Sequence, residues 1–215
     1  IKYAATFHPD IIVTAMDQNP RGGHLSNAIQ EAVDDGAVYI NGAGNSGYWE
    51  HHWLEAIDQV VLVGGTDYED GRWHEIVLGE PYLSTYGPFV TVSAPASGLK
   101  IAVPWGSGYD TQSGTSFAGP IVAGVAALVK SAYPHMDRDD IIWMIKRGVD
   151  PIIATGDTLN WMGTGRTNAY RALTMYGNVA TLADTTWAHE LWVGGDVIVP
   201  DHRTLTIAAG TTVNV

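Results

Sequence analysis

The sequence contains no cysteine among its 215 residues, which excludes disulfide bonds and thiolate metal sites. Basic residues are also scarce, with 11 Lys and Arg against 23 Asp and Glu and a formal net charge of -12. Such a chain has little positive surface to neutralise phosphates, so nucleic acid is not an expected partner. No run of 18 consecutive apolar residues occurs, and the sequence therefore predicts no membrane span.

An initiator methionine and a signal-peptide pattern are missing as well. The chain starts at Ile1 in a stretch typical of a helix interior and ends in a strand-like stretch, residues 211–215. We therefore expect a piece of a longer protein. At this length, with 46% hydrophobic residues, it can form one sizeable domain and a small additional segment.

A long apolar stretch is the strongest signal that is present. Residues 121–129 are almost all Ile, Val, Leu, Ala and Gly, which predicts a helix buried on all sides in the middle of a domain. Pro120 is expected in the first turn, where its missing N–H costs nothing. Ser116 would then lie at the helix N-terminus, where free N–H groups favour negative charge on oxygen. A Ser or Thr before a helix is more often simply an N-cap.

The eight residues 113–120 (SGTSFAGP) and the helix after them closely resemble the nucleophile motif of the subtilisin-like serine proteases, the subtilases. The usual form is Gly-Thr-Ser-x-Ala-Ser/Thr-Pro, and Gly119 departs from it at one position. The resemblance implies a serine endopeptidase that hydrolyses peptide bonds, with Ser116 as nucleophile and Thr115 in the substrate site.

Strand and helix patterns alternate along the first half of the chain. Residues 11–15 read as a buried strand, 25–35 as an amphipathic helix closed by Gly36, and 37–40 as a second buried strand. This βαβ spacing predicts a parallel sheet. Further predicted elements are strands at 59–64 and 89–94, a hairpin across 101–112, and a helix opening at Asp137 with the stripe Ile141, Ile142, Ile145 and Val149. With the resemblance, the expected fold class is α/β: a three-layer subtilisin-like fold with a mostly parallel central sheet, incomplete, followed by a small all-β segment.

A glycine-rich segment, residues 42–47 (GAGNSG), follows the second predicted strand. By itself it reads as a turn. It also resembles the subtilase Ala-Ala-Gly-Asn motif, which implies that Asn45 donates a hydrogen bond to an oxyanion. The carboxyl ends of parallel strands are where open α/β sheets bind ligands.

The same resemblance implies two walls of a substrate cleft. One is the strand edge Ala15, Met16 and Asp17, which would pair with an extended substrate, and the other is Gly42, Ala43 and Gly44. Small residues in the second wall would leave room for a sizeable P1 side chain. Asp17 stands where the family usually has Gly, and its carboxylate would favour a basic residue in the substrate.

A nucleophilic serine needs a base and an acid that orients the base. Subtilases have both before the oxyanion Asn, but here only His8 and His24 precede Asn45, and neither has the His-Gly-Thr setting of the family. We therefore expect the Asp and His upstream of this chain, and little or no peptidase activity from the chain alone. The missing N-terminal part of the domain would be a partner, besides a peptide or protein substrate.

A second pair of histidines, His51 and His52, invites a metal assignment. Adjacent residues do not share a helix face, and no third ligand stands at a recognisable spacing, so a structural or surface role is expected. The chemistry requires no cofactor. Calcium is frequent in the family, but no ligand cluster for it can be assigned.

The resemblance covers about residues 1–176, which we take as a partial peptidase domain. Residues 177–215 differ: short apolar stretches between turn residues indicate the start of a β-rich module. Residues 195–200 followed by 205–207 are typical of one coil of a β-helical or other strand-rich repeat.

Three functional interpretations remain open. The first is a subtilisin-like endopeptidase, exported as family members commonly are. The second is a pseudoprotease or protein-binding module that keeps the fold without a working triad. The third is a Ser-Glu-Asp peptidase with a similar serine motif, which Asn45 disfavours because that family prefers Asp there.

Overall fold

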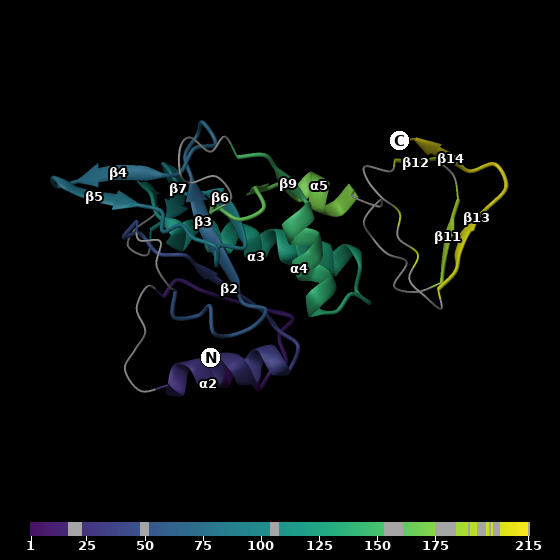
Figure 1. The fold of residues 1–215 in the computed structure, drawn as a ribbon, viewed down its shortest axis with the longest axis horizontal. Helices are drawn as coiled ribbons and strands as arrows, with labels where there is room; N and C mark the ends of the chain where they lie inside the picture. The colour runs from purple at the N-terminus through teal and green to yellow at the C-terminus, as the bar shows by residue number, and fades with distance from the viewer. Residues whose placement is uncertain are drawn as a thin grey trace.

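A computed structural model describes residues 1–16, 23–47, 52–103, 108–152, 161–174, 184–188, 190–192, 197, 199 and 203–214. A six-stranded sheet of order β1-β2-β3-β6-β10-β9 forms its centre (Figure 1). The first five strands are parallel and β9 is antiparallel to β10. The bounds are β1 Ile11–Thr14, β2 Val38–Gly42, β3 Val61–Thr66, β6 Val92–Pro95, β9 Val149–Asp150 and β10 Arg166–Thr167. The expected mostly parallel α/β sheet is confirmed.

One face of the sheet is covered by α2, His24–Asp34 (Figure 1). Its apolar stripe is buried against side chains of β1, β2 and β3, including Ile12, Tyr39 and Leu62. Gly36, with φ of 99°, follows the helix end as expected for a left-handed C-terminal glycine. The short helix α1, Lys2–Ala5, lies against α2.

The opposite face is covered by α3, Thr115–Ala132, with α4, Arg138–Arg147, and α5, Ala169–Thr174, packed beyond it. The buried side of α3 meets the inward-facing valines and isoleucine of the strands. The prediction that this helix is buried on all sides is wrong, because one stripe of it is exposed among the described residues. It consists of Pro120, Gly124, Ala127, Leu128, Ser131 and Ala132, and Leu128 is 49% exposed.

The start of α3 also differs from the prediction. The helix begins at Thr115, so Pro120 is its sixth residue and stands inside the helix rather than in its first turn. There it leaves the carbonyl of Ser116 without the usual helical N–H partner. The earlier start has a tertiary cause: the side chain of Asn45 accepts a hydrogen bond from the N–H of Thr115.

By length and composition alone, α3 could cross a membrane, and it is the one helix in the described part of the chain for which this holds. A core helix meets the same criterion, and α3 packs against four strands of the sheet. The absence of a membrane span therefore stays a prediction.

Two hairpins project from the body of the domain. One, β7 Leu99–Ala102 with β8 Tyr109–Gln112, was expected. The other, β4 His74–Val77 with β5 Glu80–Leu83, was not predicted (Figure 1). Its strands are exposed on both faces and show no alternation, and its turn residues Leu78 and Gly79 have φ of 55° and 86° without the usual Asn-Gly signal.

The apolar stripe predicted for the helix after Asp137, which is α4, needs one correction. Ile141 and Ile145 are buried as expected and Ile142 is partly buried, but Val149 lies beyond the helix in β9. Met144, not foreseen, is buried with them because α4 packs against both α3 and α5.

Near the C-terminus, two pairs of short parallel strands form (Figure 1). Thr185 of β11, Thr185–Trp187, lies opposite Leu205 of β13, Leu205–Ile207. The strands β12, Glu190–Trp192, and β14, Thr212–Asn214, pair in the same way. Parallel pairing between segments one short repeat apart is what a coil of a β-helical repeat requires. Most of residues 195–200 lie outside the described residues, and the division into two domains stays a prediction.

The N-terminus of α4 offers a test of local stability. Asp137 accepts a hydrogen bond from the N–H of Asp140, and the carboxylate of Asp140 accepts one from the N–H of Asp137. Replacing Asp137 by Ala should lower the free energy of unfolding by about 1 kcal/mol, measured by urea denaturation. Asp137→Asn keeps a side-chain acceptor and should lose clearly less, so equal losses would contradict this role.

Candidate active site

A surface pocket lies where the ends of β1 and β2 meet the start of α3. It is lined by seven residues, all of them predicted site residues: Ala15, Met16, Gly42, Gly44, Asn45, Thr115 and Ser116. Residues far apart in the sequence, Asn45 and Ser116, thus share one pocket. Parallel strands bring their carboxyl ends to the same edge of the sheet, which explains why segments after β1 and β2 converge here.

One predicted wall residue in the described part of the chain does not join them. Ala43 is 1% exposed, and its N–H donates to the carbonyl of Val63, so it continues the β2–β3 ladder instead of lining the pocket. Asp17 lies outside the described residues, and its preference for a basic residue stays a prediction.

The hydroxyl of Thr115 connects the two sides of the pocket. It donates to Oδ1 of Asn45 at 2.9 Å and accepts from the N–H of Gly44 at 3.1 Å. The N–H of Thr115 donates to the same Oδ1 at 2.9 Å. Thr115 is only 2% exposed, and its hydroxyl is used in these bonds, which orient Asn45.

The amide of Asn45 therefore has a fixed orientation. Two donors point at Oδ1, so Oδ1 must face Thr115 and Nδ2 must face away from it. No other described residue accepts a hydrogen bond from Nδ2. This amide can donate to an oxygen that carries negative charge in the pocket.

Ser116 is the second residue of α3 and is partly buried. Its N–H belongs to the helix donors that have no partner within the helix, and it makes no hydrogen bond to the described residues. The positive end of the helix dipole lies at the same place. A hydroxyl, a free N–H and a free amide thus come together at one helix terminus.

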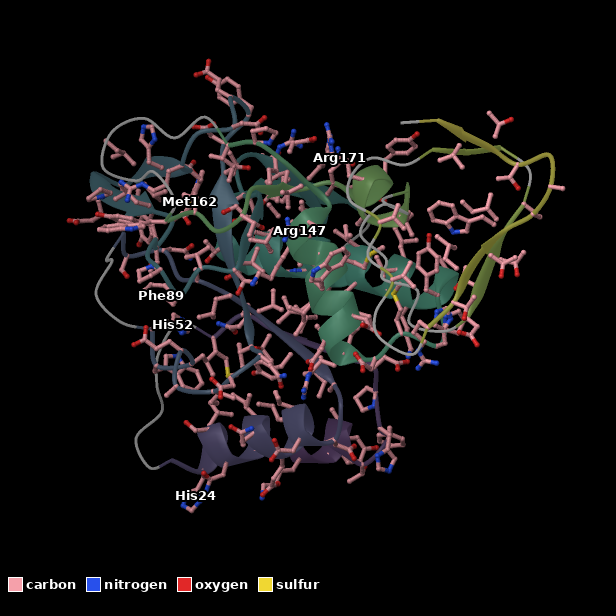
Figure 2. All side chains as sticks on the ribbon, turned by 45° about the vertical axis from the view of Figure 1, so that its right-hand side comes forward. His24, His52, Phe89, Arg147, Met162 and Arg171 are labelled. Atoms are coloured by element: carbon pink, nitrogen blue, oxygen red, sulfur yellow. The ribbon has the colours of Figure 1, made fainter. Side chains whose placement is uncertain are left out.

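The histidines of the described segments do not line this pocket. His8 is exposed and pairs with Asp35 at 2.6 Å, and His24 lies at the outer surface of α2 (Figure 2). His52 is buried, accepts from the N–H of Leu54, and packs beside Phe89 with ring centroids 5.9 Å apart (Figure 2). This packing fits the predicted structural role, whereas His51 lies outside the described residues.

No group of three His, Cys, Asp or Glu side chains is arranged to hold a metal ion within the described segments. The structure thus identifies no ligands for calcium, and the presence of a calcium ion stays untested.

One residue of the site was missed. Asn41 is fully buried in β2. Its side-chain amide accepts a hydrogen bond from the N–H of Met16 and donates one to the carbonyl of Met16, a residue of the pocket wall. A signal for it was present: a buried Asn in an otherwise apolar strand must find hydrogen-bond partners.

Together, the parallel sheet, the pocket at its strand ends and the serine at the start of a core helix define a subtilisin-like α/β protein. The sequence model of the subtilase family matches residues 1–170, and the chain belongs to this family.

Several relatives are similar to the chain over most of its length. Thermitase of Thermoactinomyces vulgaris is 32% identical over 173 residues, which are 80% of this chain and 57% of thermitase. A thermophilic serine proteinase of Bacillus sp. (strain AK1) is 31% identical over 81% of this chain and 40% of its own length. A solved structure titled as proteases from Pseudoalteromonas arctica PAMC 21717 superposes with a TM-score of 0.63 at 29% identity, covering 76% of this chain and 50% of that chain. The chain thus spans about half the length of these relatives.

The hydrogen bonds of Thr115 can be tested without an enzyme assay. Thr115→Val keeps the shape of the side chain but leaves the N–H of Gly44 without its acceptor, and should cost about 1–3 kcal/mol of unfolding free energy. Nuclear magnetic resonance should also show changed signals for the side-chain amide of Asn45. Thr115→Ser keeps the hydroxyl and should leave these signals in place, at the cost of one buried methyl group, about 0.8 kcal/mol. Unchanged amide signals in the Val variant would contradict the orienting role.

Proposed function

We propose that this chain is the nucleophile-bearing part of a serine endopeptidase, in which Ser116 attacks the peptide carbonyl and Asn45 stabilises the resulting oxyanion. The observation that supports this most directly is the fixed amide of Asn45, whose Nδ2 is left to donate in the pocket that Ser116 lines. In the reaction, Oγ of Ser116 would bond to the carbonyl carbon. Nδ2 of Asn45 and the N–H of Ser116 would donate to the oxygen as it becomes negative.

The proton of the Ser116 hydroxyl must go to a base. We propose that the Asp and His of the triad are supplied by sequence N-terminal to this chain, in the family's order Asp, His, Ser. None of the imidazoles in the described segments lines the pocket, and the relatives are considerably longer than the matched region. Without a base, Ser116 is a weak nucleophile and the chain alone should hydrolyse little or no peptide.

The N-terminal part of the domain would need a surface on which to pack, and the exposed stripe of α3 is suited to it. The stripe includes Pro120, Ala127 and Leu128, and Val13 of the neighbouring strand β1 is 40% exposed on the same side of the sheet. We propose that this apolar surface binds the segment that carries the base, which would bring an imidazole close to the N-terminus of α3.

The substrate would be an extended peptide or protein that pairs with Ala15 and Met16. Gly42 and Gly44 have no side chains, which leaves space in the opposite wall for a sizeable P1 side chain. A carboxylate at Asp17 would favour a basic residue nearby. We further propose that the parent protein acts outside the cell.

The alternative is a pseudoprotease or protein-binding module with the same pocket. It is favoured by one observation, that no described residue at the pocket can act as a base. Full-length protein that binds peptides in the pocket but never cleaves them would identify this alternative.

The nucleophile and the oxyanion donor can be tested in the full-length protein. A serine-directed phosphonate should label Ser116 there but not in the isolated chain, and Ser116→Ala should abolish both labelling and hydrolysis. Asn45→Ala should lower kcat by about 10²–10³, the factor known for the side-chain oxyanion donor of subtilisin itself. Rapid stoichiometric labelling of the isolated chain would show that no upstream base is needed.

The packing surface can be tested by adding the N-terminal part of the domain to the chain in trans. Hydrolysis should appear on mixing, and Leu128→Lys should weaken the association at least tenfold because a charge would enter an apolar contact. Ile76→Lys is a matched control, since Ile76 is 72% exposed on the remote β4–β5 hairpin. Equal effects of the two substitutions would rule out the α3 stripe as the binding surface.

A further inference from the structure

Asn41 is a polar residue near the carboxyl end of β2, with no exposed surface. Its Oδ1 accepts hydrogen bonds from the hydroxyl of Thr14 at 2.7 Å and the N–H of Met16 at 2.9 Å. Its Nδ2 donates to the carbonyls of Met16 at 2.8 Å and Gly42 at 2.7 Å. An amide has two donor and two acceptor positions, so every position is used. The reverse orientation would bring Oδ1 against two carbonyl oxygens, and the side chain is therefore locked.

These bonds continue the sheet past the end of its strands. The ladder between β1 and β2 ends where Thr14 lies opposite Asn41. Met16 lies beyond that point, so its N–H and carbonyl have no main-chain partner in β2. The amide of Asn41 bonds both of them, as the main chain of a neighbouring strand would. The edge of the sheet is thereby extended to the pocket.

The pairing with β2 also determines the side of β1 to which the N–H and carbonyl of Ala15 point. The N–H of Val38 donates to the carbonyl of Asp10, so the peptide groups of Asp10 face β2. Peptide groups alternate between the two sides along an extended chain. Those of Met16 accordingly face Asn41, and those of Ala15 face the open side of β1, where the described residues place no other strand. Ala15 can therefore offer its N–H and carbonyl to an extended peptide.

Asn41 also joins the two walls of the pocket. Its bond to the carbonyl of Gly42 reaches the wall on which α3 rests. The contact there is close, since a Cβ atom at Gly42 would lie 2.7 Å from the carbonyl oxygen of Thr115. Asn41 thus links the wall of Ala15 and Met16 to the segment on which the start of α3 rests.

We propose that Asn41 is a positioning residue for substrate, which holds Ala15 and Met16 in the geometry that an extended peptide needs for strand pairing. This inference rests on the proposed peptidase function. Asn41 does not line the pocket, so its loss should weaken the binding of long peptides and leave the chemistry at Ser116 largely intact.

The test compares two variants of the full-length protein. Asn41→Ala removes both bonds to Met16. Thr14→Val, the control, removes only the hydroxyl that bonds Oδ1 of Asn41 and the hydroxyl of Tyr39, and leaves the bonds to Met16 in place. For a long peptide substrate, Asn41→Ala should raise KM about tenfold, with kcat changed less than about threefold. For a small ester that cannot pair with the strand edge, neither variant should change KM.

A purely structural role predicts other results. It would be indicated by an unchanged KM for the long peptide, by equal losses for peptide and ester, or by the same KM increase in Thr14→Val, and each of these would overturn the proposal. If the full-length protein proves inactive, the dissociation constant of the same long peptide, measured by fluorescence anisotropy, replaces KM.

Amide hydrogen exchange separates this inference from the proposed function, because it needs no turnover. In the chain itself, the N–H of Met16 should exchange about a hundredfold faster in Asn41→Ala and close to the wild-type rate in Thr14→Val. Unchanged exchange in Asn41→Ala would overturn the positioning role even if the protein is a peptidase. Persistent activity of Ser116→Ala would overturn the proposed function and leave the exchange result standing.

Discussion

The hydrogen bonds from Thr115 to the side-chain oxygen of Asn45 are the interaction on which the site depends. They join the segment that follows β2 to the first residue of α3, 70 positions away in the chain. Gly114 precedes the helix and has no side chain to cap it, so Asn45 supplies the acceptor from elsewhere in the fold. The same bonds start the helix at Thr115, orient the amide of Asn45, and leave the N–H of Ser116 free.

The polarity of the sheet gathers the remaining parts of the site. Parallel strands end at one edge, so the segments after β1 and β2 both arrive beside the N-terminus of α3. Glycines make the approach close, as the contact of Gly42 with Thr115 illustrates. Asn41 then fixes the segment after β1 to the segment after β2. Among the described residues, hydrogen bonds of uncharged side chains, rather than ion pairs, connect the segments around this pocket.

Much of the architecture could be read from the sequence because its patterns are local. Alternating strand and helix patterns located β1, α2 and β2, and acidic residues before an apolar stripe located α4. The same reasoning missed the β4–β5 hairpin, whose strands expose both faces, and it extended the apolar stripe of α4 to Val149. Full burial of α3 was also wrong, since a wholly apolar composition does not reveal which neighbours are present to cover each side.

By itself, the sequence determined the parallel α/β class and the candidate residues Asn45 and Ser116, because both depend on short motifs and on periodicity along the chain. Tertiary structure alone decided where α3 begins, which way the amide of Asn45 points, and that Ala43 lies away from the pocket. It also decided that Asn41 supports the wall formed by Ala15 and Met16. Each of these features depends on a hydrogen bond between segments remote in sequence, and a pattern of neighbouring residues carries no information about such a bond.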